Sequence, residues 1–432
     1  MQDLRNKQVN NAALLIVNHK TGDILSWVNS NSKSLSAIKT ADYDGVLNKR
    51  QPGSTLKPFI YAIALMRGDI TAATLINDKP TAEAVGTGLH SYRNYSGKYY
   101  GKISMRQALG NSLNIPAIKI AQMIGKKTIL DTLHNLGFAS LDKTSEQYGY
   151  GIALGNGEVS LYELVQAYGI LARTGKYQPL KIIKNNKSIK KHKQVISAES
   201  SSIVANILSD SKARALEFGA GSLLSYPVQT AIKTGTSTGY RDAWILGFNH
   251  NFVAGIWMGN HNNKPMINIT GSSGPAITMR AIFKELNRYT PTKPLYLSPN
   301  LIKKNVCQKT GLLSDNRCID YEEWFIKGKF PTTTANKIVN NDYYITQPTN
   351  NLIMATDPRV PQNLQAFNFK LNQYNDNIKS IQWILNDILS GITTNNNTHQ
   401  WQLKKGKYKL YAKIFFKNKK NLKTKTVSFI IK

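Results

Sequence analysis

The sequence predicts an α+β domain followed by a small all-β domain, and three observations lead to that prediction. Strand-like runs lie at residues 12–28 and 228–260, with amphipathic helical patterns between them. Residues 291–345 are rich in Pro, Lys and Asn and have few long apolar runs. Beyond them, short alternating segments recur between turns of Asn and Gly. We therefore predict a first domain at 1–290, a connector at 291–345 and a β domain at 346–432.

Each element of the first domain has a local signal. Two apolar runs flank the turn Asn-His-Lys-Thr-Gly and predict a hairpin at 12–28. Pro52-Gly53 marks the start of an apolar helix from about Ser54 to Met66. The same reasoning predicts helices at 104–110, from Pro116, at 158–172 and at 275–289, and strands at 230–234 and 243–259, the latter interrupted at 247–250.

Composition limits the classes of protein that fit. The chain has 432 residues, of which 41% are hydrophobic, so it can bury sizeable cores. Lys and Arg number 56 against 25 Asp and Glu, a net charge of +31, which favours polyanionic surroundings unless it reflects a general bias toward Lys. No basic helix or interleaved aromatic-basic stripe accompanies the charge, so we expect no nucleic-acid partner. Two cysteines exclude a disulfide scaffold and a Cys-rich zinc protein.

Targeting signals are missing from the sequence as written. The longest apolar runs, 12–17 and 252–258, fall short of the ~18 residues that a membrane-spanning helix needs. The first of them is also too short for a signal peptide, and no small-residue cleavage site follows it. We expect a soluble chain without an export signal.

Three short motifs carry the chemistry. Ser54-Thr-Leu-Lys57, Ser112-Leu-Asn114 and Lys233-Thr-Gly-Thr236 match the S-x-x-K, S-x-N and K-T-G motifs of serine acyl-transferases that recognise penicillin. Each motif alone is weak, because the sequence repeats them. S-x-x-K also begins at Ser30, Ser36, Ser140, Ser188 and Ser209, K-T-G recurs at Lys20 and Lys309, and a literal Ser-Asp-Asn begins at Ser314. Only local context separates the motifs from these repeats.

Ser54 has the context of a nucleophile. It follows Pro-Gly and opens an apolar helix, where a spacing of three places Lys57 on the same face. A serine hydroxyl is inert near neutral pH without a base, and a lysine desolvated in a cleft can be that base. The alternative is a capping serine beside a surface lysine. We predict Ser54 as the nucleophile and Lys57 as its base.

The S-x-N motif lies between two predicted helices, in a loop that can point polar groups into a cleft. There, Ser112 would pass a proton to the leaving group and Asn114 would hold a substrate amide. The alternative is a helix cap.

The K-T-G motif lies on a predicted strand, where Gly235 lets a substrate backbone approach closely. Lys233 and Thr234 would bind a substrate carboxylate. The backbone N–H groups of Ser54 and Thr236 would form an oxyanion hole. The three motifs occur in the order nucleophile, S-x-N, K-T-G, at 58 and 179 residues from Ser54, and this ordered set is a strong signal.

With these motifs, the chain resembles the transpeptidase half of class A penicillin-binding proteins, in particular the C-type members with an additional C-terminal domain. The resemblance covers nearly the whole chain and includes the β-sandwich module that follows in the C-type proteins, here from about Gln347. The segments that carry it are Arg50-Gln-Pro-Gly-Ser-Thr-Leu-Lys-Pro-Phe, Asn111-Ser-Leu-Asn-Ile-Pro-Ala, Gly157-Glu-Val-Ser-Leu-Tyr-Glu-Leu and Lys233-Thr-Gly-Thr-Ser-Thr-Gly-Tyr-Arg-Asp-Ala-Trp.

The resemblance implies a fold and a reaction. The fold is that of serine β-lactamases and D,D-peptidases, here a five-stranded antiparallel sheet built from 12–28 and 230–259 and covered by helices. Ser54 would attack the D-Ala–D-Ala bond of a peptidoglycan stem peptide, and an amine of a neighbouring stem would take the acyl group. β-Lactams would acylate the same serine. The family implies no metal or organic cofactor.

Family members normally begin with a cytoplasmic tail, a membrane anchor and a glycosyltransferase domain, which have no counterpart in these residues. We therefore expect a split or truncated form, with a separately encoded glycosyltransferase half or other cell-wall synthesis proteins as partners. The family implies a periplasmic or cell-envelope location, associated with the inner membrane at full length. Cys307 and Cys318 match the connector of the C-type proteins, and we expect a disulfide between them in an oxidising envelope. The alternative is two free thiols. With no His pair nearby, a zinc site is disfavoured.

Other functions use the same residues. A β-lactamase or D,D-carboxypeptidase would employ the three motifs with water as the acceptor, but the extra base that efficient hydrolysis needs has no sequence signal. A truncated, non-catalytic module that binds peptidoglycan or penicillin is a further alternative.

Overall fold

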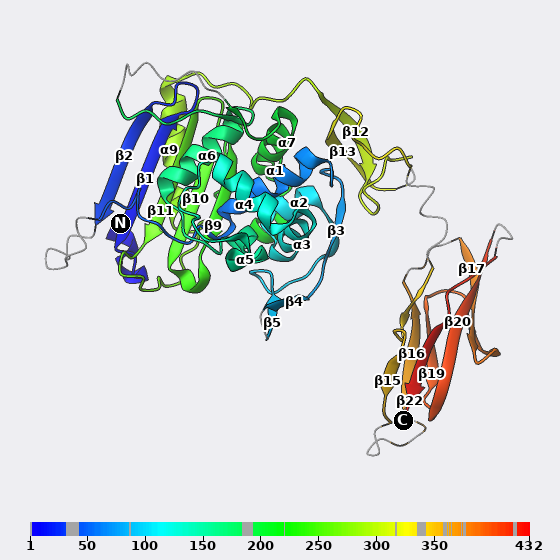
Figure 1. Ribbon diagram of the computed structural model, residues 1–432. Helices are drawn as coiled ribbons and strands as arrows, with labels where there is room; N and C mark the ends of the chain where they lie inside the picture. Colours follow the sequence, from blue (N-terminus) through cyan, green and yellow to red (C-terminus); the bar gives the residue numbers. More distant parts are fainter. Residues whose placement is uncertain are drawn as a thin grey trace. The chain divides into compact units, whose positions relative to one another are not determined.

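In the computed structural model the chain folds into two units, Met1–Thr333 and Thr334–Lys432 (Figure 1). The structure describes residues 2–31, 43–85, 88–183, 193–219, 221–315, 318–334, 343–356, 361, 363, 365–372, 374, 377–417 and 421–432. Within these ranges, none of the helices combines the length and the apolar character needed to cross a membrane.

A five-stranded sheet forms the centre of the first unit. Its strand order is β2-β1-β11-β10-β9 and all neighbouring pairs are antiparallel. The strands are β1 (Asn11–Asn18), β2 (Ile24–Asn31), β9 (Ala231–Thr236), β10 (Asp242–Phe248) and β11 (Phe252–Gly259). The predicted sheet is therefore confirmed, including the break that separates β10 from β11. The first and last parts of the unit pair directly, since β1 lies beside β11.

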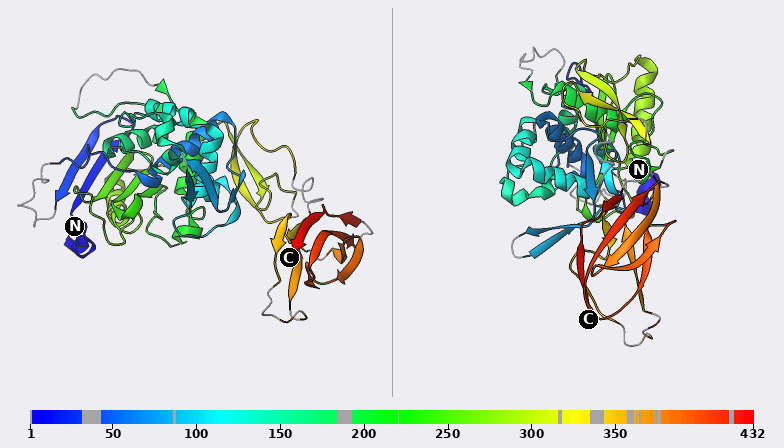
Figure 2. Two further views of the ribbon diagram at one scale, coloured as in Figure 1. Left: turned by 60° about the horizontal axis from the view of Figure 1, so that its bottom comes forward. Right: turned by 90° about the vertical axis from the view of Figure 1, so that its right-hand side faces the viewer.

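The sheet is buried on both faces, which explains why β10 reads as a continuous apolar run. Alternate residues of a strand point to opposite faces. Trp244 and Leu246 belong to a core shared with α6 (Leu161–Ala172) and α1 (Lys57–Arg67). Ile245, between them, belongs to a separate core with α9 (Pro275–Tyr289). The unit thus has three layers, with α9 on one face, where Leu4 and Phe218 also pack, and α1 and α6 on the opposite face (Figures 1 and 2).

The predicted helices are all present, and caps set where several begin. Ser104 accepts a hydrogen bond from the backbone N–H of Gln107 and caps α2. Ser160 and Glu163 form a capping box, so α6 begins at Leu161 rather than at the predicted residue 158. The remaining helices are η1 (Gln2–Lys7), α2 (Met105–Gly110), α3 (Asn114–Ile124), α4 (Lys126–Asn135), α5 (Ser145–Tyr148), η4 (Tyr150–Leu154), α7 (Ala198–Ser209), α8 (Ala215–Phe218) and η5 (Thr238–Tyr240).

The helix predicted from Ser54 differs in its first turn. Gly53–Leu56 form a 3₁₀ turn, η3, and the α-helix α1 begins only at Lys57. The reason is Pro58, which has no N–H to donate to the carbonyl of Ser54. The N–H of Lys57 donates to that carbonyl instead, and this is the shorter i→i−3 pattern of a 3₁₀ helix.

Short hairpins complete the first unit. β3 (Leu75–Asp78) pairs with β6 (Gly101–Ser104), β4 (Thr81–Val85) pairs with β5 (Gly88–Tyr92), and β7 (Lys176–Tyr177) pairs with β8 (Lys193–Gln194). The β4–β5 hairpin projects from the helical side (Figure 2).

The residues predicted as a connector divide between the two units. β12 (Leu301–Cys307) and β13 (Asp320–Ile326) form a hairpin that belongs to the first unit, which extends to Thr333 rather than 290. Phe325 and Val306 of this hairpin are buried against Ala73. Cys307 and Cys318, at the turn end of the hairpin, are joined by a disulfide.

A buried ion pair holds the hairpin to the helical layer. Both Nε and Nη2 of Arg106, on α2, donate to the carboxylate of Glu323 on β13, each at 2.6 Å. The Glu323 side chain is fully buried, and Asp210 lies 3.1 Å from Nη1 of Arg106. A bidentate pair of this kind fixes the relative position of the two elements.

The second unit is a β-sandwich. A three-stranded sheet, β14-β16-β19, and a six-stranded sheet, β15-β22-β20-β17-β18 with β21 on β20, contribute to one core around Phe369 and Trp383. The strands are β14 (Ile345–Gln347), β15 (Leu352–Met354), β16 (Ala366–Leu371), β17 (Ile378–Leu385), β18 (Ile388–Thr393), β19 (Thr398–Gln402), β20 (Gly406–Phe416), β21 (Asn421–Lys423) and β22 (Val427–Ile431).

Replacing Glu323 by alanine should strongly destabilise the first unit. The change leaves the Arg106 guanidinium in a buried site without its bidentate partner, which costs about 3–5 kcal/mol. Urea unfolding followed by tryptophan fluorescence measures the loss. The matched control is Glu322→Ala on the same strand, where an exposed pair with Lys303 is removed and little change is expected. Equal stability of the two variants would contradict the assigned role of the buried pair.

Candidate active site

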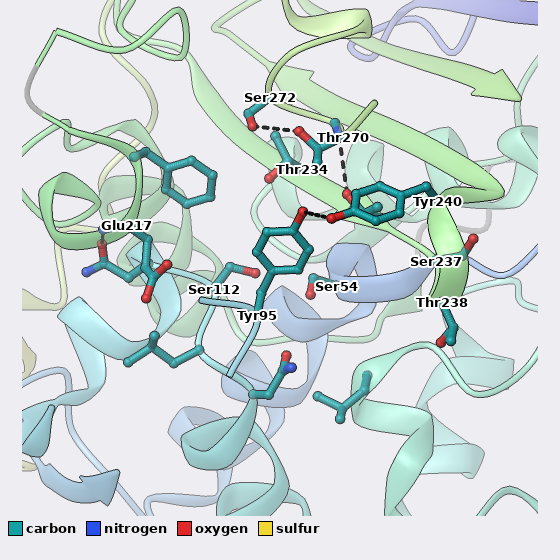
Figure 3. A pocket seen from close by; sticks show the side chains of 18 of the residues that line it. Ser54, Tyr95, Ser112, Glu217, Thr234, Ser237, Thr238, Tyr240, Thr270 and Ser272 are labelled. Carbon is teal, nitrogen blue, oxygen red and sulfur yellow. Dashed lines mark hydrogen bonds between the residues drawn. The ribbon is translucent and has the colours of Figure 1, made fainter. Parts of the chain in front are cut away.

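Ser54 lies in the 3₁₀ turn η3, between the sheet and the helical layer. Ser54 is half-buried, whereas its neighbours Gly53 and Thr55 are buried. The turn is held from both sides, since the indole N–H of Trp244 donates to the carbonyl of Gln51 and the hydroxyl of Tyr168 donates to the carbonyl of Thr55. The Ser54 side chain therefore sits on a rigid support with its hydroxyl in the pocket drawn in Figure 3.

Lys57 is fully buried one turn after Ser54. Its Nζ donates to the carbonyl of Ser112 at 2.5 Å and to Oδ1 of Asn114 at 2.6 Å. Burial lowers the pKa of Lys57 from 10.5 to about 7, and the negative charge of Glu217 opposes that shift. Near neutral pH the amine is thus unprotonated in a large fraction of molecules, and an unprotonated amine can accept a proton.

The S-x-N motif forms the turn between α2 and α3. Ser112 has a φ of 59°, a left-handed conformation that is uncommon for a residue with a side chain. The amide of Asn114 donates from Nδ2 to the carbonyl of Arg93, and its backbone N–H donates to Oδ1 of Asn94. The turn is therefore held at its Asn114 end, and Ser112 and Asn114 both line the pocket.

Lys233 connects the K-T-G strand to this turn. Its Nζ donates to Oγ of Ser112 and to the carbonyl of Thr234, both at 2.7 Å. Burial lowers the pKa of Lys233 well below its usual value, and the nearby Lys57 lowers it further. The structure thus brings all three motifs together, since Lys57 and Lys233 both contact Ser112.

The backbone of strand β9 lies close to the backbone of η3, the 3₁₀ turn that carries Ser54 and is called the serine turn below. A Cβ atom on Gly235 would lie 2.5 Å from the carbonyl oxygen of Pro52, and one on Gly53 would lie 2.5 Å from that of Thr236. Gly53 also has a φ of 54°. Because β9 is an edge strand, its outer backbone groups face the turn rather than another strand. Glycine at both positions permits this close approach.

The resulting pocket has a volume of about 410 Å³. Ser54 and the S-x-N turn form one wall, and β9 with the segment after it forms the other (Figure 3). The predicted site residues that line it are Ser54, Ser112, Asn114, Thr234, Gly235 and Thr236. Lys57 and Lys233 are buried behind this lining.

The pocket is also lined by residues outside the three sequence motifs, among them Tyr95, Tyr240 and Glu217. Tyr95 and Tyr240 come from opposite walls, and their hydroxyls are 2.7 Å apart at the mouth of the pocket (Figure 3). Glu217 is on the short helix α8. Tyr240 follows K-T-G closely enough to be suspected from the sequence, but Glu217 and Tyr95 lie in segments without periodicity or spacing that would mark them.

The repeated motifs lie elsewhere. Lys20 is in the turn after β1 and donates to Asn251, and Lys309 is in the turn after β12. Ser36 and Ser188 lie outside the described residues. Across the part of the chain that the structure describes, no group of three or more His, Cys, Asp or Glu side chains could hold a metal ion.

An antiparallel sheet flanked by helices, with a serine turn and a buried lysine opposite a K-T-G strand, is the arrangement of the serine β-lactamase and D,D-peptidase class. Residues 12–269, more than half of the chain, match the family described as penicillin binding protein transpeptidase domain. The chain belongs to this family.

Curated proteins that are similar in sequence to this chain are also penicillin-binding proteins. Penicillin-binding protein 1C of Escherichia coli K12 is 29% identical over 326 residues, covering 74% of this chain and 41% of that protein. Penicillin-binding protein 1A of Aquifex aeolicus is 28% identical, covering 76% of this chain and 45% of that protein. The chain thus spans less than half the length of these curated relatives.

Solved structures share the fold. Penicillin-binding protein 1A from Haemophilus influenzae superposes with a TM-score of 0.64 at 24% identity, over 76% of this chain and 55% of that one. The PonA1 protein of Mycobacterium tuberculosis, solved in complex with penicillin V, has a TM-score of 0.56 at 21% identity, over 66% of this chain and 81% of that one. The α+β fold class is therefore confirmed.

Replacing Gly235 by alanine should separate β9 from the serine turn. The added Cβ would meet the Pro52 carbonyl at 2.5 Å and the Thr55 methyl at 2.7 Å. We expect a loss of about 1–3 kcal/mol from this overpacking, visible as a lower melting temperature. Gly221→Ala is the control, since an added Cβ there meets no atom within 4 Å. Equal melting temperatures would show that the close approach is not required.

Proposed function

We propose that this chain carries a peptidoglycan D,D-transpeptidase that cross-links stem peptides through an acyl-enzyme on Ser54. The observation that supports it most directly is the half-buried Ser54 in a pocket beside Lys57, whose pKa burial lowers to about 7. Family membership supports the reaction class, and the geometry of the pocket supports the roles that we propose for its residues. The same serine reacts with β-lactams, which imitate the end of the donor peptide.

Lys57 is the base that activates the nucleophile. The unprotonated amine takes the Ser54 proton as Oγ attacks the penultimate carbonyl of the donor peptide. Burial makes this possible because it favours the neutral amine over the ammonium. The two acceptors that surround Nζ, the carbonyl of Ser112 and Oδ1 of Asn114, hold the group in position.

The other motif residues bind the donor and handle the leaving group. Ser112 relays the proton to the departing D-alanine nitrogen, because its hydroxyl lies within hydrogen-bond distance of Lys233 and at the pocket surface. Lys233 and Thr234 bind the terminal carboxylate, and Asn114 holds a peptide amide of the donor. The backbone N–H groups of Ser54 and Thr236, on facing walls, stabilise the oxyanion.

The acyl-enzyme then passes its acyl group to an amine of a second stem peptide. Because peptidoglycan lies in the cell envelope, we propose that the protein acts there, where its strong positive charge favours acidic wall polymers. We propose that glycan polymerisation belongs to a separate glycosyltransferase part or protein.

Ser54→Ala should lose all covalent labelling by a fluorescent penicillin, because no oxygen nucleophile remains at that position. A denaturing gel after incubation with the labelled penicillin measures this, and circular dichroism shows whether the fold is retained. Ser140→Ala is the matched control, since Ser140 begins another S-x-x-K sequence outside the pocket. A labelled band in Ser54→Ala would overturn the assignment of the nucleophile.

The rate of penicillin acylation should rise with pH through about 7, the pKa of Lys57. The active form of a general base is the unprotonated one, so the rate one pH unit below that pKa should be roughly a tenth of the plateau. Stopped-flow or timed labelling between acidic and alkaline pH gives the profile. Lys57→Ala should lose most of the rate at every pH. A flat wild-type profile, or a fast Lys57→Ala variant, would exclude Lys57 as the base.

A further inference from the structure

Glu217 places a negative charge in a pocket that is otherwise neutral at its surface. Among the residues that line the pocket, it is the single one that is charged at neutral pH. The chain as a whole has 56 basic and 25 acidic residues. An acidic side chain is therefore the less expected type at this position, and none of the roles proposed above uses it.

The carboxylate is held in place but not neutralised. Its Oε1 accepts hydrogen bonds from the hydroxyls of Ser96, at 2.7 Å, and Tyr100, at 2.9 Å. The backbone N–H of Glu217 donates to Oδ1 of Asn111, the residue before the S-x-N serine. Over the described ranges, no Lys, Arg or His nitrogen lies within 4 Å of the carboxylate. Within the same ranges, the second oxygen, Oε2, accepts no hydrogen bond.

The position of Glu217 is at the Ser112 end of the pocket. Figure 3 shows its carboxylate directed toward Ser112, on the side of Ser54 opposite to Thr238. Its charge opposes the lowering of the pKa of the buried Lys57. The motif lysines themselves use other partners, since Lys57 and Lys233 donate to the S-x-N turn and to Thr234.

We propose that Glu217 binds the acceptor amine of the transpeptidation reaction, which arrives as an ammonium ion. This inference rests on the proposed function. A primary amine with a pKa near 10.4 is protonated at neutral pH, so a fixed carboxylate attracts it by a charge-assisted hydrogen bond. The terminal carboxylate of the donor peptide has its own partners in the proposed mechanism, Lys233 and Thr234, so Glu217 is left for the cationic group of the acceptor.

The Ser112 end is also where an amine must enter. Ser112 protonates the nitrogen of the departing D-alanine in the proposed mechanism, so that nitrogen leaves along this side of Ser54. The acceptor nitrogen attacks the same acyl carbon in the reverse sense and therefore approaches along the same path. Glu217 lies beside this path.

The protons of the transfer step balance with Glu217 as a hydrogen-bond acceptor only. The docked ammonium loses one proton to solvent water, and the free amine moves onto the acyl carbon. A C–N bond forms and the ester C–O bond to Ser54 Oγ breaks. The second proton reaches Ser54 Oγ through Ser112 and Lys57, and the third stays on the new amide nitrogen.

The test compares a charged and a neutral acceptor. The whole protein is acylated with a D-alanyl thioester donor in the presence of D-alanine or methanol as the acceptor. The products of transfer and of hydrolysis are then separated by chromatography. In Glu217→Gln, the ratio of transfer to hydrolysis should fall about tenfold for D-alanine, the size expected for one lost charged hydrogen bond, and stay unchanged for methanol. Glu217→Asp should retain part of the D-alanine transfer.

Controls separate this role from the others. Working at about pH 8.5 keeps Lys57 largely neutral in every variant, so an altered Lys57 pKa does not enter the comparison. Asp131→Asn changes the net charge equally at an exposed site on α4 and should leave the ratio unchanged. Labelling by fluorescent penicillin, measured in parallel, reports the proposed function independently.

Several results would overturn the proposal. One is an unchanged ratio for D-alanine in Glu217→Gln with normal penicillin labelling. Another is an equal fall for D-alanine and methanol, which would assign a general role in deacylation. A loss of hydrolysis alone would make Glu217 the base for water. Loss of penicillin labelling in a folded Glu217→Gln would place it in acylation. Absence of labelling in the wild type would instead remove the proposed function itself.

Discussion

The burial of one lysine is the constraint on which the site depends. Lys57 sits at the start of a buried helix, so its amine is removed from water and can be satisfied only by protein acceptors. The acceptors are the Ser112 carbonyl and the Asn114 side chain. The same burial that lowers the pKa of Lys57 therefore ties the S-x-N turn to the serine turn. The low pKa of Lys57 and the position of the S-x-N turn are thus both consequences of burying this one side chain.

Elements outside the pocket maintain that placement. The S-x-N turn follows α2, and α2 carries Arg106, which is fixed by Glu323 of the β12–β13 hairpin. On the other wall, β9 is held by its pairing with β10 and by its contact with the serine turn at Gly235. The two walls of the pocket therefore rest on separate supports, the β12–β13 hairpin for the S-x-N turn and the sheet for β9.

The sequence predicted those parts of the fold that are governed by local patterns. The strands of the central sheet were readable because β1 and β10 have continuous or alternating apolar residues, and α9 because its ends carry clear signals. The three motifs were recognisable because catalysis needs specific residue types at fixed spacings. The 3₁₀ turn at Ser54 is caused by Pro58, which is visible in the sequence. The effect of Pro58 is the loss of a single backbone hydrogen bond, and periodicity does not reveal it. The Arg106–Glu323 pair spans 217 residues and has no local signal. Glu217 enters the pocket only through tertiary packing of a four-residue helix.

The distribution of charge around the pocket gives its two ends different chemical character. Lys57 and Lys233 are buried behind the wall, and their low pKa values reduce the positive charge that they present. In the proposed mechanism, Lys233 offers donors to the anionic end of the donor peptide, whereas Glu217 offers acceptors to the cationic amine. In the proposed reaction, the D-alanine that carries the carboxylate leaves first and the acceptor amine enters afterwards. The pocket therefore needs a partner for an anion in the first step and a partner for a cation in the second. A pocket with only basic groups would hold the donor and its product more tightly and would repel the protonated acceptor. A carboxylate near the point of entry resolves that conflict without reducing the contacts made by the K-T-G strand.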